Sequence, residues 1–375
     1  MMTTPCKMTT DPVDFLQIHV LGAGKGECII LGWPENRWGV IDCYAPSLKD
    51  DTTNPTLQFL RGRGVSELEF LCLTHPHDDH FRGMSQLLVH LKVRHFWRFP
   101  TVSARDLKLL AKYLVIDTER GDVAELKENA SDFVRTMEIV KKLRDKKEIV
   151  QMMVTGHQQL YPVPFSQSTR FQVWSFAPHG NQQGNYEQTL FRSFTIDGQL
   201  QPNPPNVSHN DISVGLIVSY GKTRVVLGGD VERTAWTDIR PQYQPEHFHV
   251  DAVKVPHHGS DTGYIPGLWS DFSGRKKPIA IIAPYRRFRL PKQDSLRHIS
   301  EYASKVMLTC GIDLGLAPCP AQPSLKSRMF LRARLNAKTP TPESECGRCS
   351  LYFDSEGNCI EEEYAGPAYE FVVES

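Results

Sequence analysis

Residues 74–80 read Thr-His-Pro-His-Asp-Asp-His and follow the short apolar run Phe70-Leu71-Cys72-Leu73. The apolar run predicts a buried strand. After the end of a strand, the side chains at positions i and i+2 point to the same side. Four ligand-type side chains within six positions favour an ion-binding site over a polar loop that happens to contain histidine. The segment therefore predicts a hydrolytic two-metal site with the ligands His75, His77, Asp79 and His80.

The second half of the chain supplies further ligand-type residues after short strands. Residues 225–230, Val-Val-Leu-Gly-Gly-Asp, predict a strand that ends before Asp230, which we expect to bridge two ions. Residues 251–256 predict another strand, and His257-His258-Gly259-Ser260 follow it. Carboxylates and imidazoles at the ends of separate strands are typical of α/β enzymes. The donor set predicts two divalent ions, zinc in the first place and manganese or iron as alternatives.

The motifs extend beyond the ligands over roughly residues 14–310 and resemble the metallo-β-lactamase superfamily. Within it they are most similar to the ComEC-like branch, named for the soluble domain of the competence DNA-uptake channel. The resemblance implies an α/β fold, a four-layer αββα sandwich with a dinuclear site at its edge. The segments that carry it are Gly22–Ile30, Ile41-Asp42, Thr74–His80, Asn210–Val214, Gly229–Glu232 and Pro256–Ser260.

The third ligand of the first ion stays open at the level of sequence. Many superfamily members have a separate histidine between the first motif and the bridging aspartate. Here Ser208-His209-Asn210-Asp211 stands near that place, so either His209 or Asp211 could complete the ligand set. His179 and His157 compete with them, and spacing does not choose among the four.

Of the paired histidines we favour His258 as the metal ligand and His257 as a hydrogen-bond donor to the leaving or phosphoryl oxygen of the substrate. The reverse assignment remains an alternative, because adjacent side chains point apart. The expected mechanism is attack by a hydroxide shared between two ions. Asp79 would orient this nucleophile, and His257, supported by Ser260 or Lys254, would stabilise the leaving group. Asp79 and His257 are therefore the expected catalytic residues.

The resemblance favours a phosphodiester substrate, and a basic loop points the same way. Arg286-Arg287-Phe288-Arg289 follows a predicted strand at 279–283, and arginines beside an aromatic ring can hold phosphates and stack bases. We expect Arg286, Arg287, Arg289 and Ser260 to contact substrate, either nucleic acid or a cyclic nucleotide. A solvated loop is the alternative for the arginines. An ester, thioester or lactone hydrolase is the second enzyme class, and a non-catalytic interaction domain is the third hypothesis.

Composition agrees with an enzyme that works in the cytoplasm. The 375 residues contain 43 basic and 43 acidic side chains, so the chain is not a globally basic nucleic-acid coat. No stretch approaches the ~20 apolar residues that span a bilayer, and residues 1–12 lack the apolar core of a signal peptide. Nine cysteines without an export segment indicate reduced thiols. The sequence does not determine the oligomeric state.

We predict a hydrolase domain over residues 14–315 and a proline-containing C-terminal extension over 316–375. Within the extension, residues 350–353 and 359–364 predict a β-hairpin. Cys346-Gly347-Arg348-Cys349 is half of a zinc knuckle that Cys310, Cys319 or Cys359 could complete, and unliganded thiols are the alternative.

Two helices and one long loop are expected between the motifs. Residues 105–115 and 123–147 have apolar residues at helical spacing, and the charged face of the second helix is expected to be solvated. Residues 181–207 are rich in glycine, glutamine, asparagine and proline, and they predict a long loop that could lie over the site.

Overall fold

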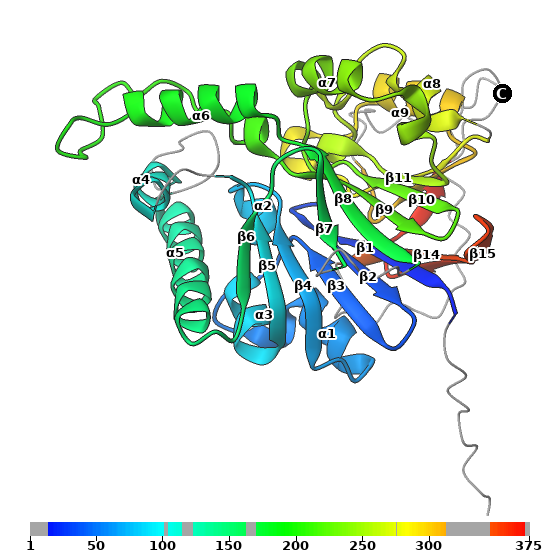
Figure 1. Ribbon diagram of the computed structural model, residues 1–375, viewed down its shortest axis with the longest axis horizontal. Coiled ribbons are helices and arrows are strands. Elements are labelled where there is room, and N and C mark those ends of the chain that lie inside the picture. Colours follow the sequence, from blue (N-terminus) through cyan, green and yellow to red (C-terminus); the bar gives the residue numbers. More distant parts are fainter. Residues whose placement is uncertain are drawn as a thin grey trace, which may run out of the picture.

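The computed structural model describes residues 14–100, 104–114, 123–162, 170–274, 276–312 and 346–371. Two eight-stranded mixed sheets face each other, and helices cover their outer faces (Figure 1). This is the four-layer αββα sandwich predicted from the sequence. No helix within the described ranges combines the length and the apolar character needed to cross a membrane.

The first sheet has the order β15-β14-β1-β2-β3-β4-β5-β6. The opening strands pair antiparallel, and the pairs from β3 to β6 are parallel. Its strands are β1 Leu16–Gly22, β2 Glu27–Trp33, β3 Arg37–Ile41, β4 Glu67–Leu73, β5 Lys92–Arg98, β6 Val150–Met153, β14 Gly347–Phe353 and β15 Cys359–Ala365.

The second sheet has the order β16-β13-β12-β11-β10-β9-β8-β7, and its centre, from β10 to β13, is parallel. Its strands are β7 Gln158–Tyr161, β8 Phe171–Ala177, β9 Gly215–Tyr220, β10 Thr223–Leu227, β11 Ala252–Lys254, β12 Ile279–Ile282, β13 Lys305–Leu308 and β16 Tyr369–Phe371. The central strands β10, β11 and β12 are almost fully buried, and β12, Ile-Ala-Ile-Ile, is a continuous apolar run.

Helices flank both sheets. The α3 and α5 helices contact the first sheet, and α7, α8 and α9 lie over the second. One buried apolar cluster fills the space between the sheets and continues between the first sheet and its helices, and a second lies between the second sheet and its helices. The helices are α1 Pro55–Gly62, α2 Asp78–Phe81, α3 Met84–His90, α4 Ala104–Leu114, α5 Val123–Asp145, α6 Gly180–Arg192, α7 Arg233–Ile239, α8 Leu268–Ser273 and α9 Gln293–Tyr302.

The predicted loop at 181–207 is wrong over its first half, which forms α6. Tyr186 and Leu190 are buried four residues apart on this helix, and the backbone N–H of His179 donates to Gln182 Oε1 at 3.0 Å where the helix begins. The segment is rich in glycine, glutamine and asparagine, which are typical of loops. The loop was predicted from this composition, and the helical spacing of the two apolar residues was not considered.

The predicted C-terminal hairpin is present as β14 and β15, and it completes the first sheet. β14 pairs with β1 along its full length, and β16 adds to the second sheet beside β13. The strands after the predicted boundary at 315 therefore belong to both sheets. The boundary itself and the proline-rich residues that follow it lie outside the described residues.

Candidate metal centre

The residues of the predicted metal site follow three strands of the two sheets. β4 ends at Leu73, and the motif continues through His77 into α2. Asp230 follows β10, and His258 lies in the short 3-10 turn η5, Pro256–Gly259, after β11. These strands run within parallel parts of the sheets, so their carboxyl ends gather the ligand-type side chains at one edge of the sandwich.

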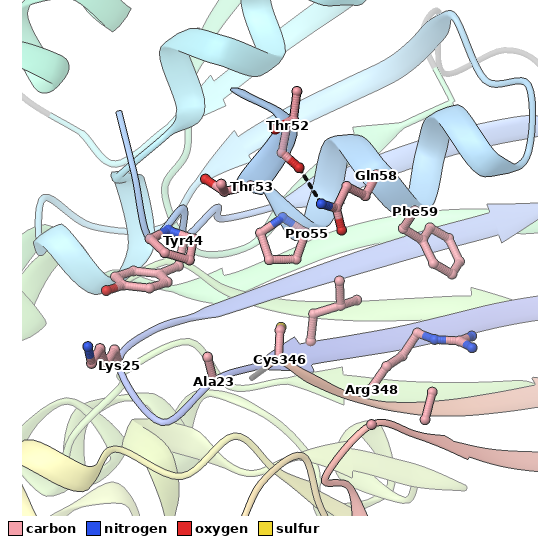
Figure 2. Close-up of a pocket in the computed structure, with 14 residues that line it drawn as sticks. Ala23, Lys25, Tyr44, Thr52, Thr53, Pro55, Gln58, Phe59, Cys346 and Arg348 are labelled. Carbon is pink, nitrogen blue, oxygen red and sulfur yellow. Dashed lines mark hydrogen bonds between the residues drawn. The ribbon is translucent and has the colours of Figure 1, made fainter. Parts of the chain in front are cut away.

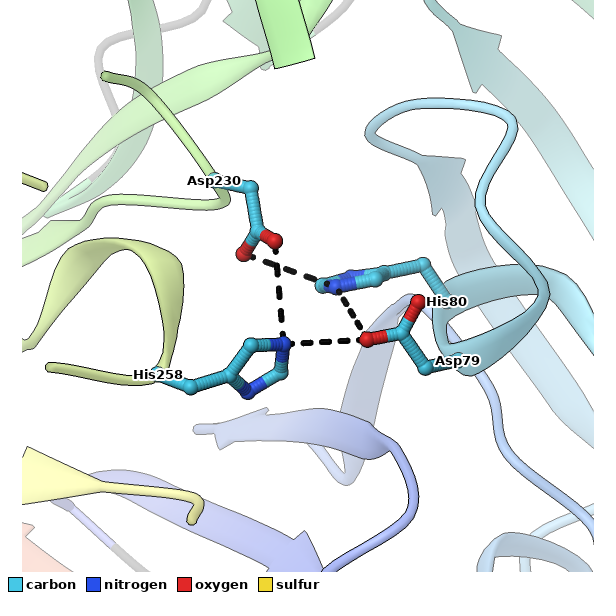
Figure 3. A group of neighbouring side chains, drawn as sticks. All are labelled: Asp79, His80, Asp230 and His258. Carbon is cyan, nitrogen blue, oxygen red and sulfur yellow. Dashed lines mark hydrogen bonds and ion pairs between the residues drawn. The ribbon is translucent and has the colours of Figure 1, made fainter. Parts of the chain in front are cut away.

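Four of the predicted ligands form one buried cluster (Figure 3): Asp79, His80, Asp230 and His258. Asp79 Oδ2 lies 3.0 Å from His258 Nε2 and 3.5 Å from His80 Nε2. Asp230 lies opposite, 3.5 Å from His80 Nε2 and 3.6 Å from His258 Nε2. Two carboxylates and two imidazole nitrogens therefore converge on one small volume.

The other two predicted ligands form a second buried group with Asp230. His75 Nε2 lies 2.9 Å from His77 Nδ1 and 3.8 Å from Asp230 Oδ2. Asp230 is common to both groups. This is the position that a carboxylate bridging two ions would have.

The donor set fits two divalent cations. His80 Nε2 and Asp230 Oδ1 are buried and form no hydrogen bond with any described residue. Leaving such buried groups unsatisfied costs about 1–3 kcal/mol each, and an ion between them would satisfy both. Imidazole nitrogen and carboxylate oxygen together suit zinc, manganese and iron, so the structure does not choose among these metals.

Electrostatics of the cluster keep its carboxylates ionised. Burial would raise the pKa of Asp79, but His80 and His258 outweigh it and hold the pKa below its ordinary value. Burial would likewise raise the pKa of Asp230, which the same two histidines lower. The two histidines lower these pKa values in their protonated form, so a cation that binds here must displace their protons.

Asp42 positions two of the ligand histidines, a role that spacing did not reveal. Its carboxylate lies 2.7 Å from His80 Nδ1 and also accepts hydrogen bonds from the backbone and hydroxyl of Thr74. Thr74 Oγ1 in turn lies 3.0 Å from His75 Nδ1. The contact with Asp42 turns Nε2 of His80 toward the cluster, as expected for a carboxylate behind a metal-binding imidazole.

His258 is oriented from the other side. Its Nδ1 lies 2.9 Å from the carbonyl oxygen of Ala283, and the ring of Tyr285 stacks on it with a 5.0 Å centroid separation. Behind it, Glu27 and Lys254 form a fully buried ion pair. Glu27 Oε2 also lies 3.4 Å from His258 Nδ1. Glu27 therefore contributes a buried negative charge behind the ligands, held in place by Lys254.

The α5 helix supports the motif through a buried polar network. Asn129 Nδ2 donates to Asp78 Oδ2 at 2.8 Å, and Asn129 Oδ1 accepts from Arg82. Asp132 accepts from the backbone N–H of Gly83 and from the Ser85 hydroxyl. The prediction of a wholly solvated polar face on α5 was therefore incomplete, because Asn129 and Asp132 face the segment that contains Asp79 and His80.

Replacing Asn129 by Leu is expected to weaken the metal site without touching a ligand. The change removes one hydrogen bond from Asp78 and one from Arg82, which keeps its bonds to Ala45 O and Glu128, so we expect the free energy of unfolding to fall by about 1–2 kcal/mol. We also expect roughly tenfold weaker metal affinity. Thermal unfolding and metal titration measure both. Glu128→Gln, which changes a more exposed partner of Arg82, is the control, and equal effects of the two variants would contradict the role of Asn129.

Among the candidates for a third ligand, the structure brings His209 to the site. Its ring lies 5.1 Å from that of His77, centroid to centroid, and its Nδ1 lies 3.0 Å from the Tyr186 hydroxyl of α6. Asp211 is half-buried and lies near Glu232, which together with burial raises its pKa. His179 and His157 contact each other, at 4.9 Å between ring centroids, and neither joins a described ligand group.

His257 lies outside the ligand groups. Its Nδ1 is 2.9 Å from Glu232 Oε1 and 3.0 Å from Thr262 Oγ1, so Nε2 is the nitrogen that could face a substrate. Ser260 accepts a hydrogen bond from the backbone of Thr262 and contacts its hydroxyl at 3.1 Å. The structure thus places Ser260 in the loop that holds His257, and contact with substrate stays a prediction.

The basic loop lies at the rim of the site. Tyr285, which stacks on His258, is followed by four exposed residues, and three of these are Arg286, Arg287 and Arg289. The Arg286 backbone N–H donates to Gly24 O at 2.9 Å, and its Nε donates to Gly311 O at 3.2 Å. The loop is therefore attached to the β1–β2 turn beside the metal centre.

The predicted zinc knuckle has no counterpart within the described ranges. No group of three or more ligand-type side chains found there includes a cysteine. Cys310, Cys346, Cys349 and Cys359 are free thiols, and Cys319 lies outside the described residues. Burial raises the pKa of the Cys346 thiol to about 12. The described thiols therefore match the unliganded alternative.

No protein-family model and no curated protein matches the chain. Similar solved structures include unliganded yeast PDE1, with 13% identity over 79% of this chain and 97% of that chain at a TM-score of 0.41. A mutant CmlA beta-hydroxylase has 11% identity, 79% and 52% coverage and a TM-score of 0.37. Hydrolase AbOPH, in the beta lactamase superfamily, has 13% identity, 54% and 55% coverage and a TM-score of 0.30.

The chain spans about half the length of two of these structures, and all identities are below 25%. The likenesses therefore carry no inference about substrate or reaction. The chain's own two facing sheets and their flanking helices form the four-layer arrangement that the sequence resemblance implied. The protein thus has a metallo-β-lactamase-like fold, whereas its likeness to the ComEC-like branch stays a prediction.

Proposed function

We propose that the protein is a metal-dependent hydrolase of phosphodiesters, with nucleic acid or a cyclic nucleotide as substrate. One observation supports this above all: a buried set of four imidazoles and two carboxylates lies directly beside an exposed loop with three arginines. Structural zinc sites favour closed, cysteine-rich ligand sets, and this set contains no cysteine. Arginine at the rim of such a site suits a phosphate-bearing substrate.

The residues divide into three tasks. Divalent ions, when bound, would supply a water of lowered pKa and polarise the phosphoryl group. His75, His77, His80, Asp230 and His258 hold these ions in the proposal, and Asp79 both holds an ion and orients the attacking oxygen. His257 donates a proton from Nε2 to the departing oxygen, and the Glu232 carboxylate at Nδ1 fixes the orientation of the ring.

The burial of this site contributes to the proposed reaction. Every proposed ligand is buried, with an exposed fraction of at most 5%. Exclusion of water strengthens each electrostatic interaction with a developing negative charge. Asp42, Thr74 and Ala283 fix the imidazole rings before substrate arrives, so reorganisation during turnover is small.

A substrate panel tests this proposal. Full-length protein, analysed for metal, is assayed on single-stranded DNA, RNA, cyclic nucleotides, bis(4-nitrophenyl) phosphate, a thioester and a lactone. We expect turnover of phosphodiesters alone, abolished by a chelator and restored by zinc or manganese. Turnover of the thioester or lactone without any phosphodiester cleavage would replace the proposal by the second enzyme class.

Replacing Arg287 and Arg289 together by Ala is expected to raise the Michaelis constant for single-stranded DNA. The slope of its logarithm against log salt should fall by roughly 0.7 for each phosphate group that the variant no longer neutralises. Turnover of bis(4-nitrophenyl) phosphate should not change, because the metal centre is untouched. Arg286 is left in place because its side chain binds Gly311 O.

Arg144→Ala on α5 is the control for this variant, since Arg144 is an exposed arginine remote from the basic loop in sequence. Equal loss of activity on both substrates would place the loop arginines in the fold or at the metal centre. Unchanged activity on both substrates would favour the alternative, in which the loop carries only solvated charge.

A further inference from the structure

A cavity of about 850 Å³ lies beside the β1–β2 turn (Figure 2). Its volume is within the range of pockets that hold small molecules or cofactors. Its walls come from the β1–β2 turn, the segment after β3, the start of α1, β14 and the turn after β15. The side chains that matter below are Lys25, Tyr44, Gln58, Phe59 and Arg348.

The lining of this cavity is cationic. Lys25 and Arg348 line it, and its described lining contains no aspartate or glutamate. Arg348 is held by Glu363 at 3.2 Å and lies 5.2 Å from the Phe59 ring, whereas Lys25 is exposed and forms no ion pair with a described residue. A second cavity of about 830 Å³ elsewhere contains three carboxylates among its cations. The charge of the first cavity therefore selects an anion.

Two aromatic rings accompany the cations. Tyr44 lies at the Lys25 end of the cavity and Phe59 at the Arg348 end (Figure 2). The Gln58 amide lies between them, and because its Nε2 donates to the carbonyl oxygen of Thr52, its Oε1 is the atom that can accept a hydrogen bond from a ligand. A lysine for a phosphate and aromatic rings for a base form the combination that binds a nucleotide unit.

The glycine-rich β1–β2 turn separates this cavity from the metal centre. A Cβ atom at Gly26 would lie 2.4 Å from the Tyr44 ring and 2.6 Å from the carbonyl oxygen of Asp79. Gly24 accepts the hydrogen bond from the Arg286 backbone on the basic loop. The turn is therefore a thin wall with the cavity on one side and the metal-ligand motif on the other, and only glycine permits so close an approach.

We propose that the cavity binds the nucleotide unit next to the scissile phosphodiester, with its phosphate at the end lined by Lys25 and Tyr44 and its base toward Phe59 at the opposite end. This inference rests on the proposed function and narrows it: a linear chain of at least two nucleotides fills both the metal centre and the cavity. A cyclic mononucleotide fills only the metal centre. The protein therefore prefers linear oligonucleotides.

Lys25→Ala and Lys25→Glu test the cavity against two substrates. One substrate is a thymidine dinucleotide with a terminal phosphate, and the other is bis(4-nitrophenyl) phosphate. We expect Lys25→Ala to raise the Michaelis constant for the dinucleotide roughly tenfold, and Lys25→Glu to raise it further, with unchanged turnover number. Neither constant should change for the small diester. Lys222→Ala, an exposed lysine on the second cavity, is the matched control.

Equal changes with both substrates, or none with either, would overturn the inference. A binding measurement tests the cavity independently of the proposed function. Full-length protein is titrated with 5′-AMP, and we expect Lys25→Ala to lower the affinity roughly tenfold. Absence of cleavage on every phosphodiester would refute the proposed function and leave this titration valid. If the wild type does not bind 5′-AMP, or if Lys25→Ala binds it with the same affinity as the wild type, the proposed nucleotide site is wrong.

Discussion

Asp79→Ala is expected to abolish turnover while leaving the protein folded. Asp79 is buried in the four-residue ligand group and contacts both His80 and His258, so its loss removes one ligand and the group that orients the attacking oxygen. We expect turnover on any substrate to fall roughly 1,000-fold or more. Metal analysis should find close to two ions in the wild type and about one in the variant, because the His75 and His77 group remains.

Asp211→Asn is the matched control for this experiment. Asp211 is also partly buried and follows His209 by two positions, but it belongs to neither described ligand group. The control should keep both ions and most of the turnover. Activity above a few per cent in Asp79→Ala, or equal losses of activity in the two variants, would place the reaction elsewhere.

Asp230→Asn is expected to have the larger effect on metal content. Asp230 belongs to both ligand groups, so its carboxylate contributes to both ions at once. We expect less than one ion per chain and no turnover, measured by metal analysis and by the assay above. Ions present at 1,000 times their dissociation constant each add about 4 kcal/mol to the free energy of unfolding.

The melting temperature of Asp230→Asn should therefore respond little to a chelator that lowers that of the wild type by several degrees. Circular dichroism before heating verifies that both proteins are folded. Two ions in Asp230→Asn would show that the carboxylate is not shared. The site would then consist of two independent centres, and the proposed bridge would be wrong.

The sequence predicted the parts of the fold and site that depend on local patterns. The apolar run before His75, the dense ligand motif and the apolar strand before Asp230 are each visible within ten residues. The same holds for the long helix α5, whose apolar positions follow helical spacing. These features need no knowledge of distant segments, because a strand or helix places its own side chains on one face.

The features that sequence reasoning missed or left open depend on contacts between distant segments. His209 comes next to His77 because α6 supplies Tyr186 to hold it, and a Gly-, Gln- and Asn-rich stretch gave little indication of that helix. Asn129 lies 51 positions from Asp78, to which it donates a hydrogen bond. Asp42 was visible as a motif residue, but its contact with His80 spans 38 positions. The spacing of residues along the sequence does not identify partners that are so far apart.

The pairing of β14 with β1 constrains how this protein can be made. His19 and Ser350, hydrogen-bonded neighbours across these strands, are 331 positions apart. Contacts between residues so far apart in the sequence form late. Nearly the whole chain has been synthesised before the outer edge of β1 can pair with β14. During that interval the β1 edge presents unpaired N–H and C=O groups that can pair with other chains. The β1 edge is therefore open to aggregation until β14 has been synthesised and has paired with it.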